Sequence, residues 1–385
     1  MGHNGSNDWQ TAQLGDVMEL FDHQRVPLNS RERQARQGEY PYYGAQGIID
    51  HIDDYIFDGR YILVAEDGEN LNSKKLPLAL FATGKFWVNN HAHILRGKLD
   101  VADDTFLLAC LNNADIKPFV TGAAQPKLSQ ANLRQIEIPL PPLPVQRRIA
   151  GILSAYDDLI ENNQRRIKIL EEMARSLYRE WFVNFRFPGH EKVPLVDSPL
   201  GSIPKRWEVK TLDQIAENFD RLRKPLSKMQ RAEIQGVYPY YGAAKVFDYI
   251  NDFIFDGEYL LMAEDGSVVT IERAPVLQLV NEKFWPNNHT HILRGKPPFA
   301  THFLYLGLSE VDISPYITGA AQPKITQENM NRIPFFCGPE TLHLQFNRLV
   351  APMISQSQVL QRRTQNLRRT RDLLLPRLLS GQGNL

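Results

Sequence analysis

The stretch YPYYGAQGIIDHIDDYIFDGRYILVAEDG at residues 40–68 returns as YPYYGAAKVFDYINDFIFDGEYLLMAEDG at residues 238–266. The correspondence continues to residue 98 at a constant offset of 198, and 32 of the 59 aligned positions are identical. TGAAQPK at residues 121–127 also recurs, at residues 318–324. A repeat this long is a domain with its connector, not a solenoid unit. Two copies of one domain present two copies of one surface, which favours a substrate with two related sites.

Short apolar segments bounded by Asp-Gly pairs indicate β-structure in each copy. The pairs at residues 58–59 and 67–68 bracket the apolar segment 61–65, and the second copy repeats the pattern. Because Asp-Gly favours tight turns, we expect a short strand between the two turns. The proline-rich IPLPPLP at residues 138–144 is expected to end the first globular domain.

Two stretches that follow the repeats carry the seam of a coiled coil. Apolar or core-compatible residues alternate in steps of four and three along residues 149–181 and, less regularly, along residues 346–378. Each stretch predicts a helix of about 35–40 residues, and the other helix is the simplest partner to bury its long apolar stripe. Pro352 is expected to kink or delay the second helix near its start.

The composition excludes several classes of function. The 44 Lys and Arg residues balance the 44 Asp and Glu residues, which argues against a general nucleic-acid binder. The two cysteines show no pairing pattern, so a reducing cytoplasm is expected. No apolar run approaches the roughly 18 residues of a membrane span. The motifs GxxxxGK[ST], HExxH, CxxC and GxSxG are all missing from the sequence, so we expect no catalytic residues in this chain.

The two His-x-His pairs, at residues 91–93 and 289–291, are the strongest metal-binding pattern in the sequence. Both imidazoles of a pair would share one face of a strand, which suits chelation. A metal site normally needs three or four protein ligands, and no cysteine or third histidine lies near. Strand packing or hydrogen bonding is therefore favoured, and no metal is expected. Adjacent Glu66 and Asp67 would point to opposite faces, so a turn is favoured over an acid–base pair.

Several segments carry residue types that suit DNA contacts. TGAAQPK joins small residues to donors for phosphates or base edges, although a plain surface turn explains it equally well. The PYYG tyrosines could wedge into a groove or belong to the core. Segment 69–84 shares one identity with its counterpart 267–282, which indicates either base-reading side chains or a tolerant loop. Segment 25–37 is a second variable candidate.

From these segments we take a set of candidate DNA-binding residues. In the first copy they are Tyr42, Tyr43, Asn70, Asn72, Lys74, Lys75, Thr121, Gln125 and Lys127. In the second copy they are Tyr240, Tyr241, Thr270, Arg273, Thr318, Gln322 and Lys324.

Taken in order, the repeats, the IPLPPLPVQRRIAGILSAYDDLIENNQRRI block, the GSIPKRWE linker and the final LLLPRLLSGQ resemble the specificity subunit of Type I restriction–modification enzymes. The resemblance covers essentially the whole chain. It implies an α+β fold in which two target-recognition domains, related by a pseudo-twofold axis, are separated by an antiparallel pair of long helices. The implied parts are domains at residues 1–140 and 207–336, spacer helices at 141–186 and 337–385, and a linker at 187–206.

The resemblance also implies a function without catalysis. Such a subunit reads a bipartite, gapped target in double-stranded DNA and directs partner subunits to methylate adenine or cleave. Two methyltransferase subunits would bring S-adenosylmethionine, because this chain has no cofactor of its own, and restriction or translocase subunits would join the full complex. The alternative is a stand-alone sequence-specific DNA-binding regulator. The variable segments predict that the two half-sites differ at some positions.

Overall fold

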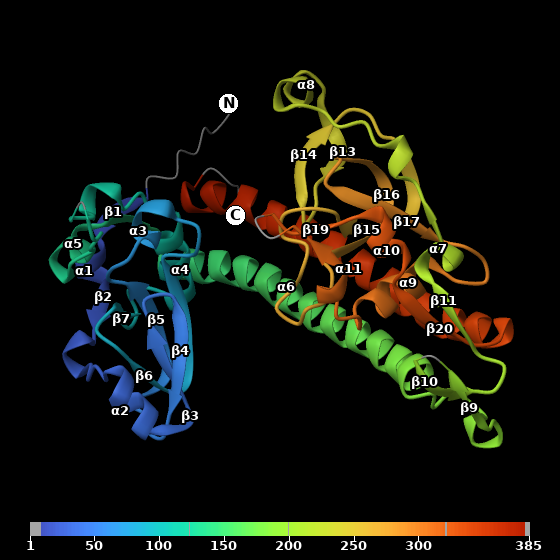
Figure 1. The fold of residues 1–385 in the computed structure, drawn as a ribbon. Helices are drawn as coiled ribbons and strands as arrows, with labels where there is room; N and C mark the ends of the chain where they lie inside the picture. Colours follow the sequence, from blue (N-terminus) through green and yellow to red (C-terminus); the bar gives the residue numbers. More distant parts are fainter. Residues whose placement is uncertain (1–8, 123, 199, 320–321, 382–385) are drawn as a thin grey trace. The chain divides into compact units, whose positions relative to one another are not determined.

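A computed structural model describes residues 9–122, 124–198, 200–319 and 322–381 of the protein (Figure 1). It divides into two compact units. The first holds Met1–Asn162 with Thr364–Leu385, and the second holds Asn163–Arg363. Each unit contains one copy of the repeat and part of each of two long helices. None of the helices in the described residues combines the length with the hydropathy that crossing a bilayer demands.

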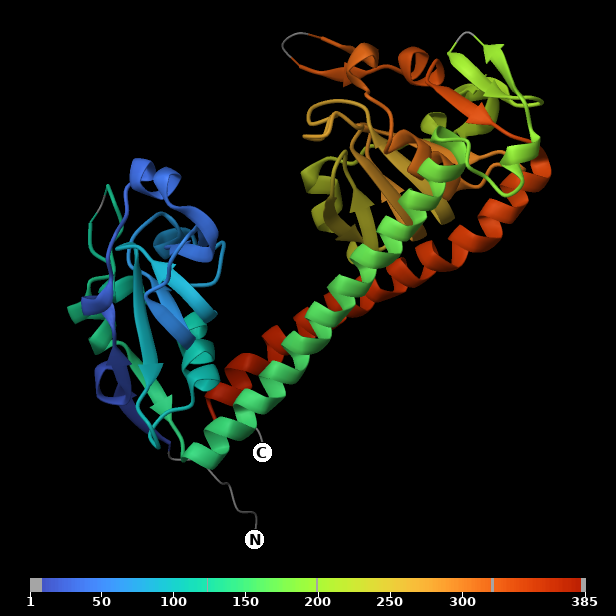
Figure 2. The same cartoon turned by 90° about the horizontal axis from the view of Figure 1, so that it is seen from below.

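The first unit is built on a six-stranded sheet with the strand order β2-β7-β5-β6-β3-β4. Neighbouring strands are antiparallel, except that β3 pairs in parallel with β6. Helix α4 packs on this sheet, and β1 and β8 form a separate ribbon (Figures 1 and 2). The elements are β1 (Gln10–Gln13), α1 (Leu14–Val17), β2 (Met18–Leu20), η1 (Asp22–Gln24), α2 (Ser30–Ala35), β3 (Gln37–Gly44), β4 (Gly47–Ile52), β5 (Phe57–Ala65), α3 (Asn70–Ser73), β6 (Ala79–Val88), β7 (Ala92–Gly97), α4 (Asp104–Asn113), η2 (Lys117–Phe119), α5 (Gln130–Gln135) and β8 (Glu137–Leu140).

The second unit repeats this architecture, with the order β12-β17-β15-β16-β13-β14 and a ribbon of β11 with β20. Helix α9 takes the place of α4. Within the predicted linker, β9 and β10 form a small hairpin. The elements are η3 (Arg179–Val183), η4 (His190–Lys192), β9 (Leu195–Ser198), β10 (Gly201–Pro204), β11 (Glu208–Thr211), α7 (Leu212–Ile215), β12 (Ala216–Asn218), η5 (Asp220–Leu222), α8 (Lys228–Glu233), β13 (Gln235–Tyr241), β14 (Val246–Ile250), β15 (Phe255–Ala263), β16 (Leu277–Pro286), β17 (Thr290–Gly295), α9 (Thr301–Leu308), η6 (Ser314–Tyr316), β18 (Ile317–Thr318), β19 (Lys324–Ile325), α10 (Gln327–Asn331) and β20 (Pro334–Cys337).

The duplication of the sequence is also a duplication of strand register. Phe57 pairs with Phe86 in the first sheet, and Phe255 pairs with Phe284 in the second. The rings of each pair stack, with centroids 5.4 Å apart in the first sheet and 5.3 Å apart in the second. Residues that correspond at the offset of 198 therefore make the same cross-strand contact in both sheets. Such cross-strand pairs are the basic unit of sheet stabilisation.

Only one of the two predicted Asp-Gly turns exists in each copy. The pair at residues 67–68 follows the end of β5, as predicted. The pair at residues 58–59 lies inside β5, so the turn expected there is wrong. Gly59 has a φ of +123° and sits opposite Gly84 of β6, and pairing with β6 continues on both sides of it. Glycine supplies the unusual backbone angle without ending the strand.

The coiled-coil seam predicted from the sequence is confirmed by burial. Helices α6 (Leu143–Tyr178) and α11 (Glu340–Leu379) carry it, and it continues into η3. Every seam residue is buried or half-buried. On the first helix these are Ile149, Leu153, Tyr156, Ile160, Asn163, Ile167, Leu170, Ala174, Leu177 and Trp181. On the second they are Phe346, Val350, Met353, Ser357, Leu360, Thr364, Leu367, Arg371, Leu374 and Leu378.

Within the second unit the two helices run antiparallel. Glu171 accepts hydrogen bonds from Ser357 and Gln361 at 2.9 and 3.0 Å. About two turns later along the first helix, the ring of Tyr178 contacts the ring of Phe346, which comes earlier in the second helix. The expectation that Pro352 delays the second helix is wrong. The helix begins at Glu340 directly after Pro339, a residue type suited to a helix start, and Pro352 lies exposed inside it.

The two units differ in how their cores are filled where the helices meet the sheet. The buried residues of the first core are almost all aliphatic, whereas the second core also contains a cluster of aromatic rings. In the second, Phe182, Phe299 and Phe303 surround His343 with ring centroids 4.7 to 5.1 Å away. His343 is fully buried, and neither ring nitrogen meets a hydrogen-bond partner among the described residues. Burial, helped by the charge of Lys210, lowers its pKa from 6.5 to about 4.

This histidine predicts a loss of stability in mild acid. Above pH 6.5 the ring is neutral in both the folded and the unfolded chain. As the pH falls toward 4, only the unfolded chain takes up the proton, so the free energy of unfolding should drop by an amount on the order of 3 kcal/mol. Urea unfolding of the second unit, followed by hydrogen exchange between pH 7.5 and 4.5, measures the drop.

The first unit offers a matched control for this prediction. Gln146 occupies the corresponding place, and its side chain bonds the backbone of Asp103, Val101 and Pro141 at 2.9 to 3.0 Å. His343→Gln should therefore keep stability at pH 7.5 and flatten the curve between pH 6.5 and 4. An equally steep curve in the variant would assign the acid sensitivity to other groups.

Candidate nucleic-acid interface

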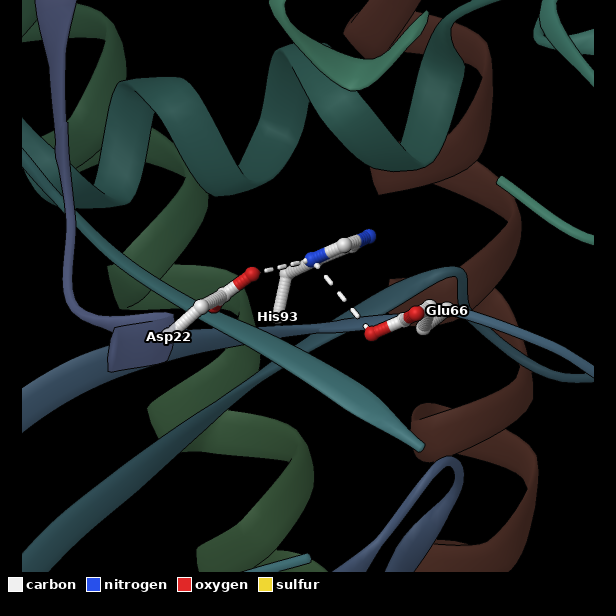
Figure 3. Close-up of side chains that lie close together, drawn as sticks. All are labelled: Asp22, Glu66 and His93. Carbon is white, nitrogen blue, oxygen red and sulfur yellow. Dashed lines mark hydrogen bonds and ion pairs between the residues drawn. The ribbon is translucent and has the colours of Figure 1, made fainter. Parts of the chain in front are cut away.

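Behind the TGAAQPK loop of the first unit lies a cluster of charged side chains (Figure 3). His93 of β7 projects between Asp22 of η1 and Glu66, which follows β5. Its Nδ1 lies 2.6 Å from Oδ2 of Asp22 and 3.8 Å from Oε2 of Glu66. Its Nε2 lies 2.8 Å from the carbonyl oxygen of Leu128, so both ring nitrogens face oxygen acceptors.

Two cations complete the cluster. Nη1 of Arg25 lies 2.7 Å from Oε2 of Glu66, and Nζ of Lys127 lies 3.1 Å from Oε1. Burial acts to raise the pKa of Asp22, but the hydrogen bond and charge of His93, together with the N–H of Ile94 and the charge of Arg25, outweigh it and the pKa is lowered. Burial opposes the ionisation of Glu66 as well, and Arg25, His93 and Lys127 together lower its pKa. Both carboxylates are therefore ionised at neutral pH, and neighbouring cations balance their charge.

The second unit builds the same cluster from the corresponding residues, Asp220, Glu264, His291, Arg223 and Lys324. The His–Asp distance is again 2.6 Å, and the His–Glu distance is 3.9 Å. Lys324 lies 3.0 Å from Glu264, and Nε2 of His291 lies 2.9 Å from the carbonyl oxygen of Ile325. The pKa values of both carboxyls are lowered here too, against the opposing effect of burial.

The cluster holds the loop above it. The N–H of Leu128 donates to the carbonyl of Glu66 at 2.7 Å, and the N–H of Gly68 donates to the carbonyl of Pro126 at 3.1 Å. Gly122 has a φ of +85°, and a Cβ there would lie 2.3 Å from the carbonyl oxygen of Gln125, so only glycine fits. Ala123 of the first loop and residues 320 and 321 of the second lie outside the described residues. The loop ends are thus fixed to the sheet in both units.

The cluster is also the place where a metal ion has to be considered. Asp22, Glu66 and His93 bring their ligand atoms within 4.8 Å of one another. Arg25 and Lys127 already pair with the oxygens of Glu66, so among the described side chains the carboxylate charges are balanced by protein cations. The two histidines of each His-x-His pair do not converge, because Nδ1 of His91 pairs with Asp67 at 2.7 Å instead. Hydrogen bonding accounts for both rings.

Comparison with known proteins places the chain in a family. The profile of the family described as "Type I restriction modification DNA specificity domain" matches residues 6–172 and 204–336. The chain belongs to this family. A Haemophilus influenzae chain described as a type I restriction enzyme specificity subunit is 36% identical over 179 residues, which are 44% of this chain and 45% of that one. The Type I restriction enzyme MjaIX specificity subunit of Methanocaldococcus jannaschii is 26% identical over 289 residues, 69% of this chain and 65% of that one.

These alignments span about half to two thirds of the curated relatives' own length. Among solved structures, a Type-I restriction-modification system S subunit from M. genitalium matches with a TM-score of 0.70 and 15% identity. The match covers 98% of both chains. At that identity it shows a shared fold, and it agrees with the α+β architecture expected for a specificity subunit.

The structure places two of the predicted tyrosines of this specificity chain in the core. Tyr42 and Tyr240 are 0% and 2% exposed, and each accepts a hydrogen bond from a backbone N–H. They cannot reach a DNA groove, because their hydroxyls anchor the segment before α2 or α8. Tyr43 is also buried, and the half-buried Tyr241 donates to Glu282 at 2.6 Å. The interpretation of PYYG as groove-contacting is therefore corrected to core packing for Tyr42 and Tyr240.

Part of the variable segment also faces inward. Asn70 is buried, and its amide bonds the backbone of Leu76 at 2.8 and 3.0 Å, which closes its own loop. Lys74 is exposed, and its ammonium group donates to the carbonyl of Ala114 at 3.0 Å. The hydroxyl of Thr270 is buried. The structure therefore gives Asn70 a role in closing its own loop instead of the predicted DNA contact, and it turns the hydroxyl of Thr270 away from the surface.

Other members of the candidate set are exposed. Asn72 and Lys75 lie on the surface, and Lys75 lines a cavity of about 360 Å³ together with α4 and both long helices of the unit. Arg273 is exposed beside Asp312, with 3.5 Å between them. The loop residues are exposed in both units: Thr121, Gln125, Lys127, Thr318, Gln322 and Lys324. The threonine hydroxyls bond the carbonyls of Lys127 and Lys324 across the loop.

The sequence pattern does not single out the partners that hold the histidines. Asp22, Arg25 and their counterparts Asp220 and Arg223 are identical between the copies at the offset of 198. The signal was present, but these residues lie upstream of the strongly repeated block, where identities are sparse. Their role becomes visible only when η1 is folded against β7.

Proposed function

We propose that this chain is the DNA-reading, non-catalytic specificity subunit of a Type I restriction–modification complex, and that each unit reads one half of a bipartite, gapped target. One observation carries the proposal. A single chain builds the same sheet, the same buried charge cluster and the same exposed loop twice. A target with two related halves in double-stranded DNA accounts for that duplication, and membership of the specificity family supports it.

The exposed residues of the TGAAQPK loops are proposed to make the DNA contacts that are common to the two half-sites. Lys127 and Lys324 keep about half of their side-chain surface exposed while bound to the cluster. Phosphate contacts are the same along any DNA sequence, so identical residues in both units suit them. Thr121, Gln125 and their counterparts provide further donors beside each lysine. Asn72, Lys75 and Arg273 remain in the proposed contact set on their exposure.

The long helices supply the surface for partner subunits. Apolar side chains stay exposed on them within each unit: Leu159, Ile169, Met173, Leu344, Leu349 and Leu373. Ile169 and Met173 lie one helix turn apart, and contiguous exposed apolar surface marks protein–protein interaction sites. We assign this surface to two methyltransferase subunits, which would bring S-adenosylmethionine and the adenine pocket. Restriction or translocase subunits would join the full complex, which would act in the cytoplasm.

Deleting the gene is expected to erase one methylation motif from the host. The reason is that partner subunits without a reader have no target. Single-molecule sequencing of host DNA should show methyladenine at one bipartite motif with the gene present, and background levels at that motif after deletion. Restoring the gene should restore the motif. A methylome that is unchanged by deletion contradicts the proposal, as does methyltransferase activity of the purified chain alone.

A further inference from the structure

Each sheet ends in a hairpin whose two strands carry bulges at matching places. In the first unit Gln37 and Tyr40 both pair with Ile52, which leaves Gly38 and Glu39 as extra residues. Further along, Tyr42 pairs with Asp50 and Tyr43 with Ile48, which leaves Ile49 as the extra residue. The hairpin β13–β14 of the second unit has the same two irregularities, with Val237 and Phe247 in the bulged positions.

The backbone of these bulges is fixed in the same way in both units. A Cβ on Gly38 or Gly236 would lie 2.4 Å from the backbone of the opposite strand, so both positions need glycine. The polar side of each hairpin is also the same, since Arg33 bonds Asp50 at 3.0 Å and Arg231 bonds Asp248 at 3.1 Å. These bonds tie α2 to β4 and α8 to β14, which lie side by side in Figure 1.

The side chains that the bulged strands present are different. The first hairpin exposes Glu39, Ile49 and His51, while the corresponding residues of the second are Val237, Phe247 and Tyr249. Ile49 is 53% exposed, and the three residues of the second hairpin are 76%, 55% and 50% exposed. A bulge is a device that re-aims a side chain out of the regular pleat. The two units thus share the bulges and differ in the side chains that the bulged strands expose.

We propose that Glu39, Ile49 and His51 in the first unit, and Val237, Phe247 and Tyr249 in the second, are specificity-determining residues that contact the base edges of the two DNA half-sites. The inference rests on the proposed function. A partner subunit that docks identically on both units needs identical surfaces, whereas half-sites of different sequence need different ones. The two hairpins share a backbone and differ in their exposed side chains, which is the pattern expected for reading two half-sites of different sequence.

The chemistry of the two sets suits base edges. A carboxylate such as Glu39 can accept from the amino group of cytosine, and apolar side chains such as Ile49 or Val237 can contact the methyl group of thymine. His51 and Tyr249 add hydrogen-bonding groups at matching positions. The variable segment after β5 is a weaker candidate, because Asn70 and the hydroxyl of Thr270 point inward.

An exchange of three side chains tests the assignment. The variant Glu39→Val, Ile49→Phe, His51→Tyr gives the first hairpin the side chains of the second. It is expressed with the methyltransferase subunits in a host free of its own methylation. We expect the methylated motif to change in one half only, with at least ~10-fold preference lost at the original half-site. The reciprocal exchange, Val237→Glu, Phe247→Ile, Tyr249→His, should change only the other half.

A matched control alters the same number of exposed, divergent residues elsewhere. Ala131→Glu, Arg134→Asn, Gln135→Arg transfers the α10 residues, including the Glu328–Arg332 ion pair, to α5. This control should keep the wild-type motif.

The other possible results of the exchange experiment distinguish the residue assignment from the proposed function. An active exchange complex that keeps the wild-type motif overturns the assignment and leaves the proposed function standing. If an exchange complex does not methylate, it is offered a library of randomised duplexes. Selection of the original half-site, or of no site by either exchange, also overturns the assignment. A wild-type complex that methylates no bipartite motif instead refutes the proposed function.

Discussion

Replacing Phe303 by alanine is expected to lower the free energy of unfolding of the second unit by about 4 kcal/mol. The ring is fully buried in α9 and meets the rings of Tyr178, Phe182 and Phe346 with centroids 4.9 to 6.2 Å away. Two of these rings come from the end of the first long helix and one from the second. The substitution therefore removes the contact that fastens both helices to the sheet. Hydrogen exchange resolved by peptide measures the loss in the second unit separately.

The first unit provides the comparison for this prediction. Phe106 takes the corresponding place in α4 and is fully buried, but its core is mainly aliphatic. Aromatic pairs contribute about 0.5–1.5 kcal/mol beyond the area they bury, so Phe303→Ala should cost more than Phe106→Ala. Phe303→Leu should restore most of the loss. Equal costs for both alanine variants would mean that the ring contacts add nothing to burial.

Much of this fold is contained in the sequence because it depends on local periodicity. The alternation of four and three along α6 and α11 predicts burial correctly, since a helix places those residues on one stripe. The repeat predicts two units with one architecture, and the matched register of Phe57 and Phe255 bears this out. The inner Asp-Gly pair does not form the predicted turn, because a dipeptide does not reveal that β5 pairs with β6 both before and after Gly59.

The candidate site was harder to predict because its contacts are long-range. His93 looked like half of a His-x-His pair, whereas its partners are Asp22, 71 positions away, and the carbonyl of Leu128. Exposure cannot be predicted from residue type either, so Tyr42 and Asn70 were counted as contacts although both are buried. The bulges of the hairpins cannot be predicted from the sequence of one strand, since a bulge is a property of two paired strands.

The charge cluster explains why the repeated blocks stay identical around segments that diverge. Glu66 joins Arg25, which opens one variable segment, to Lys127 of the shared loop. His93 connects strand β7 to the same cluster, because its ring bonds Asp22 and the carbonyl of Leu128. We therefore expect a change in any member to disturb the loop. The cluster thus holds a constant platform on which other residues can vary.

Replacing Asp22 by asparagine is accordingly expected to cost the first unit about 3–5 kcal/mol, the range for breaking a buried ion pair. The Asp22 side chain is 4% exposed, and its Oδ2 lies 2.6 Å from His93 and 3.2 Å from Gln130. An amide would place a donor where two donors already point, or else turn and lose the N–H of Ile94. The first half of the DNA target should be lost while the second unit stays folded, as measured by hydrogen exchange and by duplex selection.

Lys127→Gln separates this structural role from DNA contact. Its side chain is 53% exposed, so stability should change by less than about 1 kcal/mol. If Lys127 touches phosphate, binding should weaken on every sequence, and the slope of log K against log salt should fall by about one. The matched variant Asp220→Asn should instead destabilise the second unit and abolish recognition of the second half-site. Should Asp22→Asn leave the first unit as stable as the wild type, the cluster does not hold the loop, and its identity in both units needs another cause.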